Sequence, residues 1–165
     1  MTQSNMTILA ALIGMIAFMA VLAILIDLFL RRRRDRRISR MDELDGHDFE
    51  FFCADLLRAQ GFIDVEVTRG SGDFGVDILA EKDGVTYAVQ CKRYNGPVGV
   101  EAVLRTYGGQ AYYERMVGAV MTNQYFTSPA VDAAEKLHIL LWDRGYMDAM
   151  IEEGASRGSQ QSPST

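Results

Sequence analysis

Cysteine and histidine are scarce in this chain of 165 residues, which contains only two of each. The four residues are His47, Cys53, Cys91 and His138, and no two of them stand at the short spacing that is typical of a zinc site. The sequence therefore predicts no zinc site.

Positive charge is scarce after residue 40. Residues 41–165 hold 10 basic and 20 acidic side chains, which gives this part of the chain a net charge of −10. Contacts between basic side chains and phosphates supply most of the nonspecific affinity of proteins for DNA. The charge balance therefore counts against a strong nonspecific DNA binder.

Charge of either sign is absent from residues 6–26, a mostly apolar run of 21 residues. At about 1.5 Å per residue, a helix over this run would be roughly 30 Å long, the thickness of a bilayer core. A buried core helix usually keeps a polar face. A cleaved signal peptide would begin with basic residues and end at a cleavage site, and both are missing here. We therefore expect residues 1–30 to be an N-terminal anchor with one transmembrane helix, which spans the membrane through residues 6–30.

Arginine is concentrated directly after this run, with six arginines in the sequence RRRRDRR at residues 31–37. Beside a membrane span, such a block holds its end of the helix in the cytoplasm, and it can also bind anionic lipids. A nucleic-acid-binding patch and a solvated charge run are the alternatives. We expect residues 31–40 to be a basic juxtamembrane segment of a single-pass protein of the inner membrane, with the following domain in the cytoplasm. That compartment also argues against a disulfide.

The remaining sequence predicts an α/β domain over residues 41–153, a mixed sheet flanked by helices. Helices are expected over residues 44–62, 98–116, 127–137 and 145–153, and strands over residues 63–68, 76–81, 85–94, 117–122 and 138–143. The strands over 76–81 and 85–94 are separated by a tight turn, so they should form a hairpin. Residues 154–165 contain few apolar side chains and are expected to be a disordered tail.

Three glycines, Gly70, Gly72 and Gly75, fit the pattern G-x-G-x-x-G that binds dinucleotides in some proteins. That site requires a helix directly after the last glycine, because the helix N-terminus holds the pyrophosphate. Here the alternating residues 76–81 predict a strand instead. The sequence therefore favours either a flexible loop or a turn that places Asp77 at the start of that strand.

Polar side chains share one face of the predicted hairpin. Because side chains alternate along a strand, Gln90 and Lys92 should face one side, whereas Cys91 faces an apolar layer with Val89. Asp77 lies on the partner strand, across the turn. A carboxylate, an amide and an ammonium group can therefore meet on one face of the sheet. The alternative is an ordinary surface patch on an exposed hairpin face.

Glu50 is expected at the margin of the buried stripe of the first helix, almost level with Leu57 on a helical wheel. A carboxylate at the edge of a core is costly unless a cation or donor satisfies it. Lys92 or a metal ion are the two candidates for that partner.

Three sequence blocks resemble the Mrr-type restriction endonucleases, which belong to the PD-(D/E)XK nuclease superfamily. The blocks are FEFFCADLLRAQGF, GSGDFGVDILAE and YAVQCKRYNGPVG, and they occur in the order found in that family. The later sequence GAVMTNQYFTSPAVDAAEK resembles the next strand and helix of the family. The resemblance covers roughly residues 44–142 and implies a restriction-endonuclease-like core of one helix, three strands, a helix and a strand.

The resemblance implies a catalytic set of Glu50, Asp77, Gln90 and Lys92, in which Gln90 replaces a common acidic residue. It implies Mg²⁺ as cofactor, with Mn²⁺ as a substitute. Asp77, the Gln90 amide and the backbone carbonyl of Cys91 would be metal ligands, and Glu50 would hold a second metal or a metal-bound water. Lys92 would orient or deprotonate the attacking water and stabilise charge on the phosphate.

The resemblance, taken together with the predicted membrane span, implies a membrane-anchored, metal-dependent endonuclease that hydrolyses phosphodiester bonds of DNA. RNA as the substrate and a homodimer as the assembly are left open. The alternative function is a catalytically inactive module on the same fold, which binds a nucleic acid or a partner protein.

Overall fold

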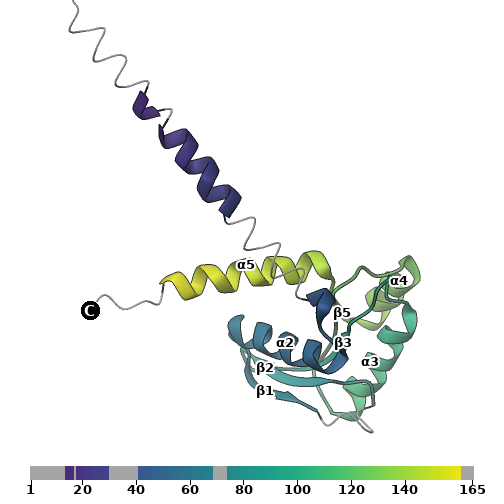
Figure 1. The fold of residues 1–165 in the computed structure, drawn as a ribbon. Helices are drawn as coiled ribbons and strands as arrows, with labels where there is room; N and C mark the ends of the chain where they lie inside the picture. Colours follow the sequence, from purple (N-terminus) through teal and green to yellow (C-terminus); the bar gives the residue numbers. More distant parts are fainter. Residues whose placement is uncertain (1–13, 17, 30–40, 69–73, 161–165) are drawn as a thin grey trace, which may run out of the picture. The chain divides into compact units, whose positions relative to one another are not determined.

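The computed structural model of the chain describes residues 14–16, 18–29, 41–68 and 74–160 (Figure 1). The chain divides into two compact units, residues 1–39 and residues 40–165, which are described separately below.

In the first unit, residues 14–16 and 18–29 are helical, and their side chains are exposed. The rest of the predicted anchor and the arginine block lie outside the described residues. None of the helices within the described ranges combines the length and the apolar character that crossing a membrane requires.

The second unit is built on a sheet whose five strands lie in the same order in space as in sequence. The strands are β1 (Ile63–Val67), β2 (Ile78–Lys82), β3 (Val85–Lys92), β4 (Val117–Thr122) and β5 (Leu140–Trp142). The pairs β1–β2 and β2–β3 are antiparallel, whereas β3–β4 and β4–β5 are parallel. The predicted hairpin and the predicted mixed sheet are therefore confirmed.

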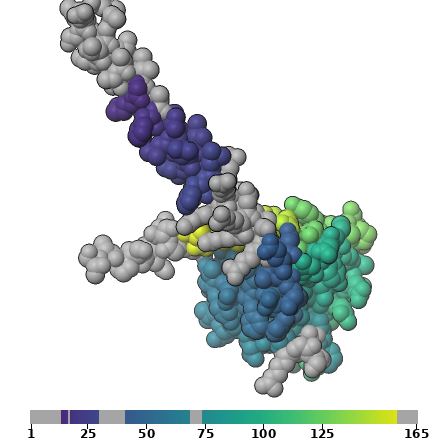
Figure 2. Space-filling model, viewed as in Figure 1, coloured from purple at the N-terminus to yellow at the C-terminus, as the bar shows by residue number. Residues whose placement is uncertain are grey.

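Four helices cover the two faces of this sheet, and they are α2 (Gly46–Ala59), α3 (Val100–Tyr112), α4 (Ser128–Leu137) and α5 (Arg144–Gln160). Helix α2 packs on β1 and β3 and contacts α5, whereas α3 packs on β3, β4 and α4. Figure 2 shows α2 on the side of the domain that faces the viewer. The central strand β3 is therefore covered by α2 on one face and by α3 on the other.

Local sequence explains why α2 forms where it was predicted. Asp45 caps its N-terminus, since the Asp45 carboxylate accepts a hydrogen bond of 2.8 Å from the Asp48 amide. Phe49, Cys53 and Leu57 are fully buried and repeat at four-residue spacing, which places them on one side of the helix. The same face presents Glu50 at its edge.

The prediction of a disordered tail over residues 154–165 is wrong for its first part, because α5 continues to Gln160. The rest of that segment lies outside the described residues. The first half of α5 is held by the buried Ile151 and by Gln60, whose Nε2 donates to the Met150 carbonyl at 2.6 Å. Once such contacts fix the first turns, each further residue adds one backbone hydrogen bond, so the polar sequence extends the helix.

Candidate active site

Asp77 lies directly before β2 and is held by backbone hydrogen bonds on both sides. Its amide donates to the Val89 carbonyl at 2.8 Å, and its carbonyl accepts from the Thr68 amide at 2.9 Å. Its side-chain Oδ2 accepts from the Cys91 amide at 2.6 Å. A short bond from an amide to a carboxylate is strong, so the Asp77 carboxylate is fixed at the centre of the sequence Gln90-Cys91-Lys92.

Gln90 is directly opposite Asp77 in the hairpin, because Ile78 pairs with Val89. Its side chain is buried between the sheet and α3, with 1% of the residue exposed. The amide oxygen faces the Thr106 hydroxyl at 3.5 Å. Because the only proton of that hydroxyl makes a shorter bond of 2.9 Å to the Ala102 carbonyl, the contact with Gln90 is weak.

The Gln90 amide nitrogen is turned toward the glycine turn before Asp77. A Cβ atom at Gly75 would lie 3.1 Å from Gln90 Nε2 and 3.0 Å from Arg105 Cβ, and Gly75 has a φ of +79°. Glycine is therefore required here by both backbone conformation and space. Rotation of the Gln90 amide by half a turn would present its oxygen, the atom that binds a hard cation, to this side.

Lys92 ends β3 on the same face as Gln90. It is half-buried and lines a shallow hollow of about 110 Å³ together with Tyr94, Glu101 and Arg105. No hydrogen bond or ion pair joins the Lys92 ammonium group to another residue in the described part of the chain. Its own carbonyl accepts a hydrogen bond of 2.7 Å from the Thr122 hydroxyl, which fixes the end of β3 to β4.

Cys91 points to the opposite face of the sheet, toward α2. Burial raises the pKa of the Cys91 thiol well above its usual value, and the Cys53 thiol and the negative charges of Asp77 and Glu50 raise it further. Both cysteines are buried and unpaired by any disulfide. Cys91 therefore stays a neutral thiol, and only its backbone amide and carbonyl are available to the site.

Glu50 is half-buried, with 22% of its side chain exposed, and its Oε2 lies 3.1 Å from the Nδ1 atom of His47. The sequence suggested Lys92 or a metal ion as its partner, but not His47. No ion pair between Glu50 and Lys92 is present. The negative charges of Glu50 and Asp77 both raise the pKa of the Cys91 thiol, so each carboxylate lies near Cys91.

The oxygen atoms around Asp77 suit a hard divalent cation. The described residues contain no group of three or more His, Cys, Asp or Glu side chains that could hold a metal ion. Mg²⁺ does not require such a group, because it commonly binds one or two carboxylates and keeps several water ligands. Asp77, a rotated Gln90 amide, the Cys91 carbonyl and Glu50 through water are compatible with that donor set.

Asn123 positions the chain after β3, a role that was not predicted from the sequence. Its side chain is buried and holds the backbone of Tyr94 at both ends: Oδ1 accepts from the Tyr94 amide and Nδ2 donates to the Tyr94 carbonyl, both at 2.9 Å. Nδ2 also donates to Asp42 Oδ1 at 2.8 Å. The available signal was a polar pair, Thr122-Asn123, directly after a buried apolar strand.

Gly109 of α3 was also missed, although it sets the distance between α3 and the turn that carries Asp77. A Cβ atom at Gly109 would lie 2.4 Å from Val76 Cγ2 and 2.7 Å from the Phe74 carbonyl oxygen. From the sequence alone, the adjacent pair Gly108-Gly109 indicates only a less stable helix. Its second member permits the close approach of helix and turn.

The family comparison agrees with the resemblance seen in the sequence blocks. Residues 41–151 match the family model of the Mrr catalytic domain, which is described as a restriction endonuclease. This match covers more than half of the chain and confirms the resemblance. No curated protein shows a significant match to the chain.

Three solved structures share the fold. A protein of unknown function, AF1548, is 24% identical with a TM-score of 0.57, over 69% of this chain and 67% of that one. The DNA modification-dependent restriction endonuclease AspBHI is 20% identical with a TM-score of 0.56, over 75% of this chain and 36% of its own. The MspJI restriction endonuclease, solved with a 27-mer oligonucleotide, is 20% identical with a TM-score of 0.55, over 76% and 33%. The chain thus spans about a third of the length of the latter two, and these likenesses show the fold alone.

Proposed function

The chain belongs to the Mrr-type restriction endonuclease family, and from this premise we propose that it is a metal-dependent endonuclease that hydrolyses phosphodiester bonds of DNA. The observation that carries the proposal is the bond between the Asp77 carboxylate and the Cys91 amide. This bond holds Asp77 against the β3 segment Gln90-Cys91-Lys92. The side chains of Gln90 and Lys92 in this segment face α3. AspBHI and MspJI, which share the fold of this chain, are named as restriction endonucleases.

Each residue has a distinct task in this proposal. A bound Mg²⁺ or Mn²⁺ would neutralise charge on the scissile phosphate and make a water molecule more nucleophilic. Asp77 supplies the fixed anionic ligand, Gln90 adds an amide oxygen, and Glu50 adds a second negative charge near Cys91. Lys92 orients the attacking water and stabilises the charge that develops on the phosphate.

We also propose that residues 6–30 anchor the protein in the inner membrane, with the nuclease domain in the cytoplasm. The support is the uncharged run over residues 6–26 and the arginine block over residues 31–37. A reporter enzyme that works only outside the inner membrane, fused to the C-terminus, should be inactive, whereas a reporter that works only in the cytoplasm should be active. The reverse pair of results would overturn the proposed topology.

The charge of the domain supports a second candidate function. A net charge of −10 over residues 41–165 weakens nonspecific attraction to phosphates, which favours a binding module without catalysis. Such a module would bind a nucleic acid or a partner protein but would not cleave DNA with any divalent metal.

A cleavage assay separates these two functions. The full chain, purified in mild detergent, is incubated with supercoiled plasmid in the presence of Mg²⁺, Mn²⁺ or EDTA, and with RNA of similar length. We expect nicked plasmid with either metal and none with EDTA. Binding without nicking in both metals would support the inactive module, and cleavage of RNA alone would change the proposed substrate.

A further inference from the structure

Two exposed aromatic rings stack on each other beside the candidate site. The rings of Phe74 and Tyr112 have centroids 3.9 Å apart and planes at 25°, and Tyr113 meets Tyr112 edge-on at 5.1 Å. Phe74 and Tyr112 are 56% and 58% exposed. Large aromatic side chains normally bury most of their surface, so an exposed stacked pair suggests a surface that is covered by a ligand.

The backbone ties this aromatic pair firmly to the site. Phe74 has a φ of +48°, a left-handed conformation that is unfavourable for a residue other than glycine. The close approach of Gly109 to the Phe74 carbonyl, at the C-terminal half of α3, fixes the turn in this position. Only two residues separate Phe74 from Asp77, so the Phe74 ring cannot move far from the candidate metal ligand.

Basic side chains lie on the same side of α3, toward its N-terminus. Arg105 packs over Gly75, and it lines the hollow that also contains Lys92 and Tyr94. The Arg105 guanidinium is 3.8 Å from Glu101, and both side chains are mostly exposed, so this ion pair holds it only weakly. Positive charge is therefore available between an exposed tyrosine at one end and the stacked rings at the other.

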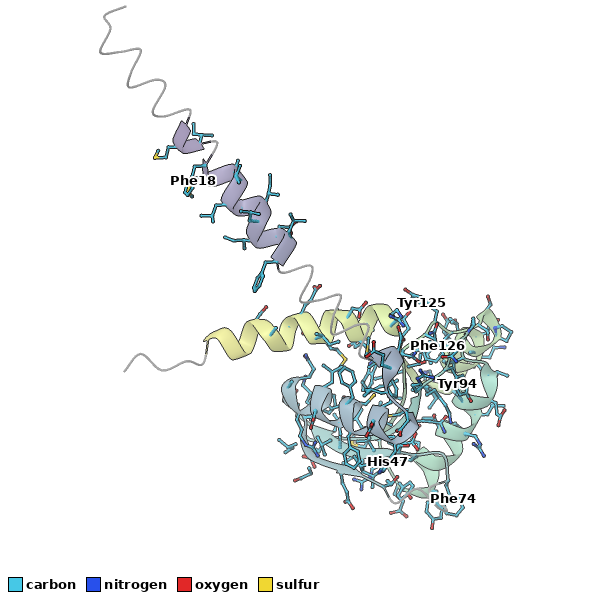
Figure 3. All side chains as sticks on the ribbon, in the orientation of Figure 1. Phe18, His47, Phe74, Tyr94, Tyr125 and Phe126 are labelled. Atoms are coloured by element: carbon cyan, nitrogen blue, oxygen red, sulfur yellow. The ribbon has the colours of Figure 1, made fainter. Side chains whose placement is uncertain are left out.

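Together these residues form a strip beside α3, which we call the α3 strip: Lys92, Tyr94, Arg105, Phe74 and Tyr112. Arg105 and Tyr112 are seven residues apart and share one side of the helix, about 10 Å from each other along its axis. In Figure 3, Tyr94 and Phe74 lie well apart on the side of the domain that carries α3. The strip thus alternates aromatic and basic groups.

We propose that the α3 strip binds an unpaired DNA strand, so that the substrate is single-stranded or locally unpaired DNA. A base would stack on the exposed face of the Phe74–Tyr112 pair, and neighbouring phosphates would contact Arg105 and Lys92. This inference rests on the proposed nuclease function, since it takes the phosphate at Lys92 to be the one that is cleaved. It names the substrate class of that same site.

Physical reasons favour an unpaired strand over an intact duplex. Bases in a duplex are stacked on each other, so their faces are not accessible to an aromatic side chain on the protein surface. Alternating aromatic and basic groups are typical of single-strand binding, where stacking supplies much of the affinity. Stacking does not depend on net positive charge, which suits a domain whose net charge is −10.

A second copy of the chain is the competing occupant of α3. Val100, Leu104 and Tyr107 are exposed along another side of this helix, at the spacing of one apolar stripe. That stripe and the α3 strip lie on different sides of α3, so substitutions can test them separately. A homodimer formed through this stripe would dissociate on substitution there, which would lower the mass measured in solution.

The test measures binding without cleavage. The full chain in EDTA is titrated with a labelled oligothymidylate of about 20 nucleotides, and with a duplex of the same length, by fluorescence anisotropy. We expect tighter binding of the oligothymidylate. Tyr112→Ala and Phe74→Ala should each weaken that binding by about 5-fold or more, whereas Tyr112→Phe should keep the parental affinity. Equal affinity for both DNAs, or an unchanged affinity in Tyr112→Ala, would overturn the proposal.

Two controls keep the result specific. Tyr107→Ala removes a tyrosine of the same helix whose exposure is similar to that of Tyr112, and it should leave binding unchanged. Light scattering on each variant shows whether self-association has changed; if Tyr107→Ala lowers both mass and affinity, the surface is a dimer interface and the proposal fails. Arg105→Gln should lower both affinity and its dependence on salt, because one phosphate contact is lost.

Binding and cleavage measured on the same protein distinguish this inference from the proposed function. If the strip binds unpaired DNA as expected but no divalent metal produces cleavage, the nuclease function fails, whereas the binding of unpaired DNA by the strip stands. If metal-dependent cleavage is observed but duplex DNA binds and is cut as well as unpaired DNA, the inference fails and the nuclease function stands.

Discussion

Strand β3 fixes the position of the Asp77 side chain. The Asp77 carboxylate accepts from the Cys91 amide, so this candidate metal ligand and the segment Gln90-Cys91-Lys92 are joined by one short hydrogen bond. Gln90 brings no charge to this arrangement. Any cation bound there would therefore depend on two carboxylates, Asp77 and Glu50, for its neutralisation.

This dependence predicts the effect of Glu50→Gln. The variant keeps the shape of the side chain and removes one of the two negative charges, so cleavage should require much higher Mg²⁺ and should slow down. The thermal midpoint should change little, because Glu50 is partly exposed and a glutamine can still hydrogen-bond to His47. A Mg²⁺ titration of the nicking rate, with thermal unfolding of the same preparation, measures both effects.

Asp55→Asn is the matched control, since Asp55 lies on the same helix with 79% of its side chain exposed. It should keep the parental Mg²⁺ requirement. If Glu50→Gln and Asp55→Asn give the same titration curve, Glu50 does not belong to the site and is an ordinary residue of α2.

Helix α3 contains two adjacent glycines, of which one packs closely against the turn before Asp77 and the other has open space around it. A Cβ atom at Gly109 would collide with Val76 and with the Phe74 carbonyl, whereas a Cβ atom at Gly108 would have no neighbour within 4 Å. Gly109→Ala must therefore displace either the helix or the turn before Asp77. We expect a loss of about 1–3 kcal/mol of unfolding free energy, together with a fall in cleavage rate.

Gly108→Ala provides the comparison within the same helix. Alanine is favoured over glycine in a helix interior, so this variant should gain about 0.5–1 kcal/mol of stability and keep its activity. Urea denaturation of both variants gives the two free energies. A Gly109→Ala variant as stable and active as Gly108→Ala would show that the turn does not depend on close contact with α3.

The elements were predictable where local sequence alone determines them. The Asp45 cap and the buried repeat of α2 are sufficient to define that helix, and the tight turn with alternating strands defines the β2–β3 hairpin. Its register then places Gln90 opposite Asp77 without further information. The tail was mispredicted because α5 is fixed by a contact between Gln60 and Met150, which lie 90 residues apart in the sequence.

The α3 strip could not be read from the sequence for a similar reason. Phe74 and Tyr112 are far apart in the chain, and only the packing of α3 on the turn before β2 brings the rings together. Likewise, the His47 contact with Glu50 depends on side-chain orientations that helical spacing permits but does not require. The relative positions of Asp77, Gln90 and Lys92 were therefore predictable from strand pairing, whereas the surface around them depends on tertiary contacts.

At the scale of the whole domain, Asp42 joins the start of the second unit to the end of the sheet nearest the site. Its Oδ1 accepts from Arg144 at 2.5 Å and from Asn123 at 2.8 Å, and its carbonyl accepts from Arg93. Because Asn123 also holds the backbone of Tyr94, this cluster connects residues from four separate segments.

The Asp42 cluster predicts a pH dependence of stability. The hydrogen bond from Arg144 lowers the pKa of the Asp42 carboxyl below its usual value, with further lowering by Asn123 and by the Arg144 and Arg93 charges, against an opposing effect of burial. A lowered pKa in the folded state stabilises the fold above the usual carboxyl pKa of about 3.9, and that contribution is lost as pH falls through the folded-state value.

Asp42→Asn should therefore lower the thermal midpoint at neutral pH, and the difference from the parent protein should shrink in acid. Thermal unfolding over a pH series measures this difference. Asp132→Asn, which changes an exposed aspartate of α4, should show no such trend. A difference between Asp42→Asn and the parent that stays constant from neutral pH to acid would contradict an ionic role for Asp42.

The central claim is that the Lys92 ammonium group, at the hollow beside Asp77 and Gln90, participates in phosphodiester cleavage. The most direct measurement is the Mg²⁺-dependent nicking rate of Lys92→Ala beside that of Lys136→Ala, which removes an exposed lysine from the last turn of α4. Loss of a group that assists the water and stabilises the phosphate should reduce the rate by about 100-fold or more, with no change in thermal midpoint, while Lys136→Ala nicks at the parental rate. A folded Lys92→Ala protein that nicks DNA as fast as the parent would contradict the account.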